Sequence, residues 1–365
     1  MHFLTVFLHY AIPSLIVLTV LVFVHEMGHF WVARRNNVRV EVFSIGFGPE
    51  IFGWTDRRKT RWKFSMLPLG GYVKMFGDAN AASAPDEMLA QMTPEERAVS
   101  FHHKSLTQRA AVVFAGPLAN IVFTFVVLTG LFATAGQPFT PPIVGGVLAD
   151  SPAARAGVLP GDRIVAINGR GIERFQDIAQ TVQFALDEPL KIEILRNGNR
   201  VSLTTTPDIV EQKDSFGHSY KIGRLGLEST KDSEYVRYAP IAAAGRAAEE
   251  ISFITVSSAK AIGQMFSGKR PFGETGGPLR MGEWSTEAFW NGPAAFVFLL
   301  AVLSLNLGLI NLLPIPMLDG GHLLFYAVEA VRRRPLAPRI QDYGFRIGLT
   351  LVLLLMIFVI WNDVT

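Results

Sequence analysis

Four long uncharged apolar runs constrain the fold of this 365-residue chain more than any other feature. The runs are Phe3 to Val24, Ala110 to Ala135, Pro293 to Leu318 and Ile347 to Trp361. A helix needs roughly 20 apolar residues to cross a bilayer, so each run predicts one transmembrane helix. Because the fourth run is short, we expect Tyr343 and Trp361 to lie at the interfaces and the side chain of Arg346 to reach toward water.

The composition favours a membrane protein over a soluble one. Hydrophobic residues make up 49% of the chain and charged residues only 18%, and the mean hydropathy is +0.29, which is high for a soluble domain. No Lys or Arg precedes the first run, which argues against a cleaved signal peptide and for a retained helix. The chain has no cysteine, so disulfides cannot indicate its compartment.

Basic residues beside the runs predict the orientation in the membrane. They cluster after the first run and between the third and fourth, at Arg34, Arg35, Arg39, Arg57, Arg58, Lys59, Arg61, Lys63, Arg332, Arg333, Arg334 and Arg339. Loops rich in Lys and Arg remain in the cytoplasm, so both termini and the region 136–292 should be extracytoplasmic. Anionic lipid headgroups explain this clustering, and the net charge of +3, better than nucleic acid does.

The end of the first run carries His25, Glu26 and His29 in the sequence HEMGH. A charge in the middle of a bilayer costs about 2.5–3.5 kcal/mol, so these residues should be paired or ligate an ion. Histidines four residues apart share one helical face and can bind one metal, while the glutamate takes a proton from the water that the metal activates. Such a short pattern often arises by chance on the solvated face of a soluble helix. This explanation largely fails here, because the motif lies in an apolar run.

A catalytic zinc takes three protein ligands and keeps one open position. Asp319 is the natural third ligand, because it ends the third run in PIPMLDGG, a segment with two prolines and two glycines. Such irregular backbone is tolerated at membrane depth only where it is buried in protein or lines a cavity. Imidazole and carboxylate donors suit Zn2+, and iron or cobalt is also compatible with them.

Asn311 precedes Asp319 on the same segment. Its amide can donate a hydrogen bond to the oxyanion that forms when water attacks a peptide carbonyl, or it can make a polar contact between helices. Asn306 fits only the second role, a polar contact between helices. His322 fits either a supporting group or a residue at a helix start, so we leave both outside the predicted ligand set.

The motif His25-Glu26-Met27-Gly28-His29, taken together with NLLPIPMLDG at 311–320, resembles the site-2 protease family of intramembrane zinc metalloproteases. Four stretches extend the similarity to its bacterial regulator of sigma-E protease branch: FSIGFGPEIF (43–52), LPLGGYVKMFGD (67–78), FAGPLANIVF (114–123) and RIQDYGFRIG (339–348). The resemblance implies that His25, His29 and Asp319 bind Zn2+, that Glu26 is the general base and that Asn311 contacts substrate or oxyanion. It also implies a multi-pass protein of the bacterial cell inner membrane.

Between the first two runs, residues 42–52 and 62–75 alternate apolar residues with glycine and carry few charges. This pattern predicts β-hairpins that dip into the membrane interface; a packed cytoplasmic loop is the alternative. The family resemblance implies a sheet whose edge pairs with an extended substrate. Residues 77–97 are rich in alanine, proline and acidic residues, which predicts a mobile surface segment.

Residues 143–206 predict a compact α/β module. In order it contains an apolar strand at 143–148, a helix from Ser151-Pro152 to Gly157, a strand at 162–169, a helix from about Phe175 to Leu186 and a hairpin that turns at Asn197-Gly198. This order, with SPAARAGVLPGDRIVAINGRGI at 151–172, resembles a PDZ domain. PDZ domains bind an extended peptide, commonly a C-terminus, along a strand and a helix, and we expect that groove between 143–148 and the helix from Phe175.

The stretch YKIGRLGLES (220–229) either closes this domain with another strand or is the remnant of a second one. Residues 239–266 are predicted to form a helix that can rest on the membrane surface, and 267–284 a glycine-rich return toward the third run. The predicted segments are 1–34, 35–109, 110–136, 137–230, 231–292, 293–328, 329–342 and 343–365, with the transmembrane helices in the first, third, sixth and eighth.

The predicted fold is a polytopic α-helical membrane protein with four transmembrane helices, membrane-associated β-hairpins and one extracytoplasmic α/β PDZ domain. We expect an endopeptidase that cuts within or beside the transmembrane segment of single-span substrates. The resemblance implies pre-trimmed anti-sigma factors and signal-peptide remnants as substrates, with the PDZ domain limiting access of bulky ectodomains. The alternatives are a PDZ-bearing membrane scaffold without catalysis and a transporter, which is disfavoured because paired inverted segments are absent.

Overall fold

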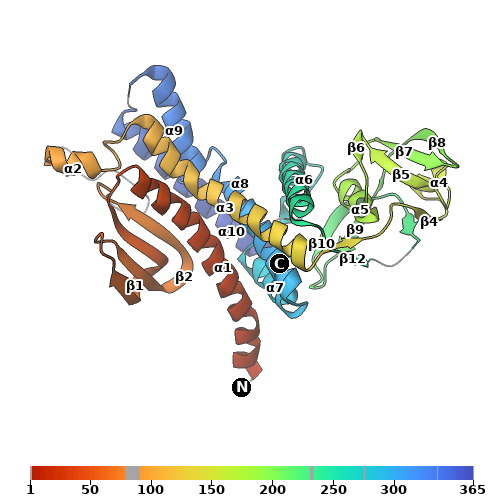
Figure 1. Ribbon diagram of the computed structural model, residues 1–365, viewed down its shortest axis with the longest axis horizontal. Helices are drawn as coiled ribbons and strands as arrows, with labels where there is room; N and C mark the ends of the chain where they lie inside the picture. Colours follow the sequence, from red (N-terminus) through yellow and green to blue (C-terminus); the bar gives the residue numbers. More distant parts are fainter. Residues whose placement is uncertain (1, 79–90, 231–233, 275, 335, 365) are drawn as a thin grey trace. The chain divides into compact units, whose positions relative to one another are not determined.

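The computed structural model describes residues 2–78, 91–230, 234–274, 276–334 and 336–364 (Figure 1). The chain divides into two compact units, one formed by Met1–Leu128 with Gly276–Thr365 and the other by Thr129–Thr275. The first unit contains α1 (His2–Arg35), β1 (Val40–Thr55), β2 (Arg61–Met75), α2 (Pro94–Val99), most of α3 (Leu106–Thr134), α7 (Pro278–Trp290), α8 (Pro293–Asn311), α9 (Asp319–Arg332) and α10 (Pro338–Val364).

The second unit is rich in short strands. Its elements are β3 (Gln137–Phe139), β4 (Val144–Val147), α4 (Pro152–Arg155), β5 (Arg163–Ile167), β6 (Arg170–Gly171), α5 (Phe175–Gln183), β7 (Leu190–Arg196), β8 (Asn199–Thr205), β9 (Asp208–Lys213), β10 (Ser219–Arg224), β11 (Leu227–Ser229), β12 (Glu234–Val236), α6 (Pro240–Phe266) and η2 (Phe272–Glu274). Because α6 and α7 carry helix through much of 240–290, the glycine-rich return predicted at 267–284 is partly helical.

Four helices of the described chain are long and apolar enough to cross a membrane, as the four apolar runs predicted. They span His9–Arg35, Leu106–Thr134, Pro293–Asn311 and Tyr343–Asp363. The fourth extends beyond the uncharged run at both ends, because the helix continues through Arg346 and reaches Asp363. Length and hydropathy therefore identify the same four segments in sequence and structure.

The predicted segment 293–328 contains the irregular backbone that its prolines and glycines indicated. The helix α8 ends at Asn311, and α9 begins at Asp319 after a loop. The prolines of this loop lack a backbone N–H, and Met317 adopts the left-handed conformation, with φ of 87°. The break makes Asp319 the first residue of α9, so its carboxylate is presented at a helix start rather than along a helix side.

Glycines let the loop pack against its neighbours. A Cβ on Gly320 would overlap with the carbonyl oxygen of Leu313, and a Cβ on Gly321 would overlap with that of Ile315. On α10, a Cβ on Gly348 would overlap with the carbonyl oxygen of Pro316. The start of α9 and the middle of α10 therefore both hold the loop that carries Asp319.

The strands β1 and β2 fold back on each other to form a small antiparallel sheet beside α1 (Figure 1). The part of β1 around Phe43 pairs with Val73 on one side and with Trp62 on the other. No further described strand pairs with residues 71–75, so they form an edge of this sheet. The hairpins predicted at 42–52 and 62–75 are thus present as two longer strands.

Apolar side chains at the far end of this sheet are exposed, namely Phe47, Ile51, Phe52, Trp54, Phe64, Met66 and Leu67. Of the surface segment predicted at 77–97, residues 79–90 lie outside the described residues. Its last part forms the helix α2, whose start is capped reciprocally by Thr93 and Glu96.

The core of the second unit lies under the four-stranded sheet β6-β5-β7-β8. The hairpin between β7 and β8 turns at Asn197 and Gly198, with φ of 50° and 83°, as a type I′ turn requires. The strand β10 pairs with β9, and β11 pairs with β4. The stretch 220–229 therefore supplies two strands to this same module.

A cavity lies along α5, as predicted for one wall of the groove, but its other wall differs from the predicted one. A cavity of about 580 Å³ runs beside Ile178 and Val182 of α5, and its opposite wall is formed by Ile222, Leu225 and Leu227. Residues 143–148 are not among those that line it, because β11 lies beside β4 and takes its place. The sequence order alone did not show that 222–227 returns to α5.

A buried ionic cluster joins α5 to α6 within the second unit. The guanidinium of Arg174 binds the carboxylate of Asp177 at 2.6 Å and lies 3.7 Å from that of Glu250 on α6. Burial raises the pKa of Glu250 above its ordinary value, although the nearby Arg174 opposes this shift. The predicted helix over 239–266 is thus attached to the strand-rich module by charged side chains.

Candidate active site

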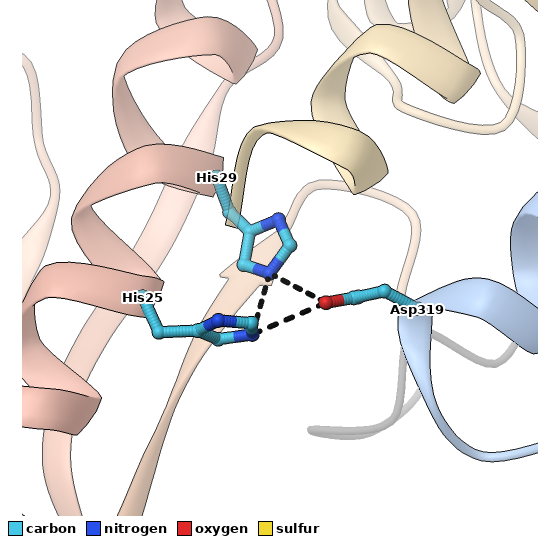
Figure 2. A group of neighbouring side chains, drawn as sticks. All are labelled: His25, His29 and Asp319. Carbon is cyan, nitrogen blue, oxygen red and sulfur yellow. Dashed lines mark hydrogen bonds and ion pairs between the residues drawn. The ribbon is translucent and has the colours of Figure 1, made fainter. Parts of the chain in front are cut away.

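The imidazoles of His25 and His29 meet on one face of α1. Their Nε2 atoms are 3.2 Å apart, and both side chains are buried. Figure 2 shows the two rings pointing toward the same place from successive turns of the helix. The i, i+4 spacing that the sequence suggested therefore brings two nitrogen donors to one point.

Asp319 reaches that point from the start of α9 (Figure 2). Its Oδ2 lies 3.1 Å from Nε2 of His25 and 3.5 Å from Nε2 of His29. This oxygen is buried and makes no hydrogen bond with any donor in the described chain. A carboxylate oxygen that faces two imidazoles without a hydrogen bond is arranged to share a cation with them.

The three donor atoms fit a zinc ion. Zinc lies about 2.0–2.2 Å from nitrogen and oxygen ligands in tetrahedral sites, so two ligands of one ion are separated by roughly 3.3–3.5 Å. The separations of 3.2, 3.1 and 3.5 Å lie close to this range. His25, His29 and Asp319 are also the one group of three potential ligands found together in the described residues.

A backbone carbonyl sets the protonation of His29. Its Nδ1 lies 2.9 Å from the carbonyl oxygen of Val112 on α3. A carbonyl can only accept a hydrogen bond, so Nδ1 carries the proton and the lone pair of Nε2 faces the other two donors. Metal-binding histidines are commonly oriented in this way.

Glu26 and Asn311 line one cavity of about 190 Å³ together with the three donors. Val73, on the edge of the sheet, lines the same cavity as Glu26. Asn311 is the last residue of α8, at the point where the broken segment begins. All five predicted site residues therefore meet, and His322 lines the same cavity without joining the three donors.

Close packing of α1 and α3 brings the second helix to the site. A Cβ on Gly28 would overlap with the carbonyl oxygen of Ala115, and a Cβ on Gly116 would overlap with Nε2 of His29. In the second apolar run, Gly116, Pro117 and Asn120 are positions where the sequence predicts close helix packing or access. The structure places Gly116 directly against the face of α1 that carries His25 and His29.

Sequence reasoning did not assign two contacts of the histidines. The carbonyl of Val112 leaves no signal in a sequence, because every residue has one. Asn120 did leave a signal, since it is an amide in an uncharged apolar run, and its Nδ2 lies 3.3 Å from Nδ1 of His25. Sequence alone did not connect this amide to His25.

The chain is similar to known metalloproteases over nearly its whole length. The model of peptidase family M50 matches residues 13–355. A Rhizobium meliloti protein, named as a candidate zinc metalloprotease, is 43% identical over 362 residues, which cover 98% of this chain and 97% of the relative. Metalloprotease MmpA of Caulobacter vibrioides is 39% identical over 380 residues, which cover 98% and 96% of the two chains.

One solved structure resembles part of the chain. It is the PDZ domain of an SdrC-like protein from Listeria monocytogenes, which is 19% identical and matches 25% of this chain and 88% of its own. The TM-score of 0.19 is too low to assign a fold.

Proposed function

Because the chain belongs to peptidase family M50, the site-2 proteases, and is a metalloprotease, we propose that it is an endopeptidase that cleaves peptide bonds within or beside membrane spans. The observation that carries this proposal is the convergence of His25, His29 and Asp319 in one cavity with Glu26. Three of these residues lie on α1, a helix that is long and apolar enough to cross a membrane.

In this proposal His25, His29 and Asp319 hold Zn2+. Zinc supplies Lewis acidity when bound, which polarises a peptide carbonyl and makes water a better nucleophile near neutral pH. Glu26 takes the proton of the attacking water and later gives it to the leaving amine. The side-chain amide of Asn311 donates a hydrogen bond to the carbonyl oxygen as negative charge develops there.

The substrate is proposed to bind as an extended strand. A peptide bond in a helix is occupied by its own hydrogen bond and shielded from attack, so the substrate has to unwind before cleavage. The edge residues Gly71, Tyr72 and Val73 line the same cavity as the catalytic groups. Their location supports pairing of the unwound segment with the sheet edge by β-augmentation.

Residues 137–230 of the second unit are proposed to act as a PDZ domain that filters substrates. The element order and the apolar cavity along α5 support this role, and extended peptides, including C-termini, are its proposed ligands. The proposed substrates are single-span proteins such as pre-trimmed anti-sigma factors and signal-peptide remnants. The basic loops support a bacterial inner-membrane protein with both termini and this domain on the periplasmic side.

The catalytic proposal is tested with purified full-length protein and a single-span model substrate. We expect the Glu26→Gln variant to retain zinc and lose about 100-fold or more of the cleavage rate, because general base catalysis typically contributes 10²–10⁴-fold. A chelator should abolish cleavage by the wild type, and the exposed-site control Glu249→Gln should behave as wild type. Equal cleavage by wild type, Glu26→Gln and chelated protein would contradict the proposal.

The filtering proposal is tested by closing the cavity beside α5. Ala179 is exposed and lines this cavity, so Ala179→Trp fills the space that a peptide would occupy. We expect the rate of cleavage to change for substrates with long ectodomains and to stay the same for trimmed substrates. The control Ser202→Trp places the same side chain on β8, away from the cavity. Identical selectivity in all three proteins would exclude a filter at this groove.

A further inference from the structure

A buried amide contacts the candidate metal site from α3. Asn120 is fully buried, and its Nδ2 lies 3.3 Å from Nδ1 of His25. Its Oδ1 is also buried and has no hydrogen-bond partner in the part of the chain that the structure describes. An amide in an apolar helix is expensive unless both polar atoms are used, so this arrangement calls for an explanation beyond helix packing.

The two histidines differ in what faces their outer nitrogen. His29 faces the carbonyl of Val112 at 2.9 Å, which only accepts, so the tautomer of its ring is fixed. His25 faces an amide, whose NH2 group donates and whose oxygen accepts. The oxygen and the NH2 group of an amide have nearly the same shape, so half a turn of the side chain exchanges them.

The described orientation of the Asn120 amide defines one chain of hydrogen bonds through both histidines. Nδ2 of Asn120 donates to Nδ1 of His25, so the ring proton of His25 is on Nε2. That nitrogen can then donate to Nε2 of His29, 3.2 Å away, and Nδ1 of His29 donates to Val112. In this state, however, Nε2 of His25 has no lone pair to offer a metal.

We propose that Asn120 is the positioning residue that prepares His25 for metal binding. This inference rests on the proposed function, because it takes His25 as a ligand. When Nε2 binds a cation, the ring proton is on Nδ1 and needs an acceptor. The Oδ1 atom of Asn120 can accept this hydrogen bond once the amide has turned. It is also the atom of the amide that has no hydrogen-bond partner among the described residues.

The backbone around Asn120 is held by hydroxyl groups from two helices. The carbonyl oxygen of Asn120 accepts hydrogen bonds from Thr124 at 2.9 Å and from Ser304 of α8 at 3.2 Å. Thr124 also reaches the carbonyl of Ala301 on α8, at 2.9 Å. These contacts hold the backbone carbonyl of Asn120 and not its side-chain amide, so loss of one of them tests helix packing separately from the contact with His25.

The test measures zinc affinity of the full-length protein in detergent by competition with a chromophoric chelator. We expect Asn120→Leu, which has similar size and no polar atom, to bind zinc about 10–100-fold more weakly, as is typical when a partner of a metal-binding histidine is lost. Asn120→Asp retains the acceptor and should bind zinc as tightly as wild type or more tightly. Thr124→Val removes a neighbouring buried hydroxyl and should change the affinity by less than about threefold.

Each alternative result has a defined meaning. Wild-type affinity in Asn120→Leu would overturn the inference, and so would an Asn120→Asp protein as weak as Asn120→Leu, because a packing role would make both substitutions harmful. An equal loss in Thr124→Val would show that general helix packing is responsible. Zinc binding that is unchanged in His25→Ala would instead overturn the ligand assignment of the proposed function.

A measurement on the wild type covers the case in which Asn120→Leu does not fold. In protein labelled with ¹⁵N-histidine, the nitrogen chemical shifts report which ring atom carries the proton. The signal of His25 is assigned by its absence in His25→Ala. In the zinc-loaded protein we expect a proton on Nδ1 of His25, and an unprotonated Nδ1 would overturn the inference.

Discussion

Gly116 of α3 lies directly against the ring of His29 on α1, so that a Cβ at residue 116 would overlap with Nε2 of this histidine. The same Cβ would lie 2.9 Å from Cε1 of His25. The helix that carries Asn120 therefore approaches both histidines through a residue without a side chain.

Gly116→Ala should displace the ring of His29 and lower both metal content and activity. Overpacking of this kind costs about 1–3 kcal/mol, so we expect a loss of roughly tenfold or more in cleavage rate. Gly130→Ala is a matched control on the same helix, because a Cβ there meets no atom within 4 Å. Normal zinc content and activity in Gly116→Ala would contradict the close contact.

Asp319→Asn should reduce the amount of zinc bound after purification, measured by elemental analysis. The substitution keeps the size of the side chain but removes the negative charge that helps to hold a cation. Glu249→Gln replaces an exposed carboxylate of the second unit and should leave zinc content unchanged. Equal zinc content in the two variants would remove Asp319 from the ligand set.

Gly348→Ala should weaken zinc binding although residue 348 is not among the residues that line the site cavity. The added methyl group would overlap with the carbonyl oxygen of Pro316 and push the loop that presents Asp319. We expect zinc affinity to fall by about tenfold, equivalent to about 1.4 kcal/mol of strain transmitted to the loop. Leu349→Ala, at an exposed neighbouring position, is the control and should bind zinc normally.

Asp363→Ala should destabilise the attachment of α10 to α7. The carboxylate of Asp363 accepts hydrogen bonds from the backbone N–H groups of Gly277 at 3.0 Å and Leu279 at 3.1 Å, at the start of α7. Loss of such a cap costs about 1 kcal/mol, and Arg280 also loses its nearest carboxylate, at 3.6 Å. We expect a lower midpoint of thermal unfolding, with Asp363→Asn intermediate because it retains an acceptor oxygen.

Asp162→Asn should lower stability at neutral pH and have less effect in acid. Two hydrogen bonds from Arg196, at 2.7 and 2.8 Å, hold the pKa of Asp162 below its ordinary value of 3.8. Because the folded-state pKa is lowered, the stabilisation is complete above about pH 4 and is lost as the pH falls through that lower pKa.

Thermal unfolding of wild type, Asp162→Asn and the exposed-site control Asp187→Asn at pH 7 and in acid checks this dependence on pH. We expect the difference between Asp162→Asn and wild type to narrow in acid. A difference that is the same at both pH values would contradict it.

Elements that depend on a pattern of neighbouring residues could be predicted from the sequence. The four apolar runs correspond to four long helices, and the Asn197-Gly198 turn lies between two paired strands. The break between Asn311 and Asp319 was only partly predictable: the prolines indicated irregular backbone, but the predicted segment still continued to 328. Its extent depends on packing of the loop against Gly348, which lies on another helix.

The location of the groove beside α5 was not predictable from local pattern. It depends on whether β11 pairs with β4, and these strands are far apart in the sequence. The same limit applies to Val112 and Asn120, because their contacts with the histidines exist only when α1 and α3 pack closely. Sequence showed an amide in an apolar run but not which group it faces.

The sequence by itself determined the four long apolar helices and the identities of the five residues that meet in the cavity, because hydropathy, i, i+4 spacing and motif composition are properties of short segments. Only the tertiary structure decided that Asp319 begins a separate helix, that Gly116 leaves space for His29, and that Asn120 faces His25. These features depend on distances between segments far apart in the chain, which are set by packing of the whole unit.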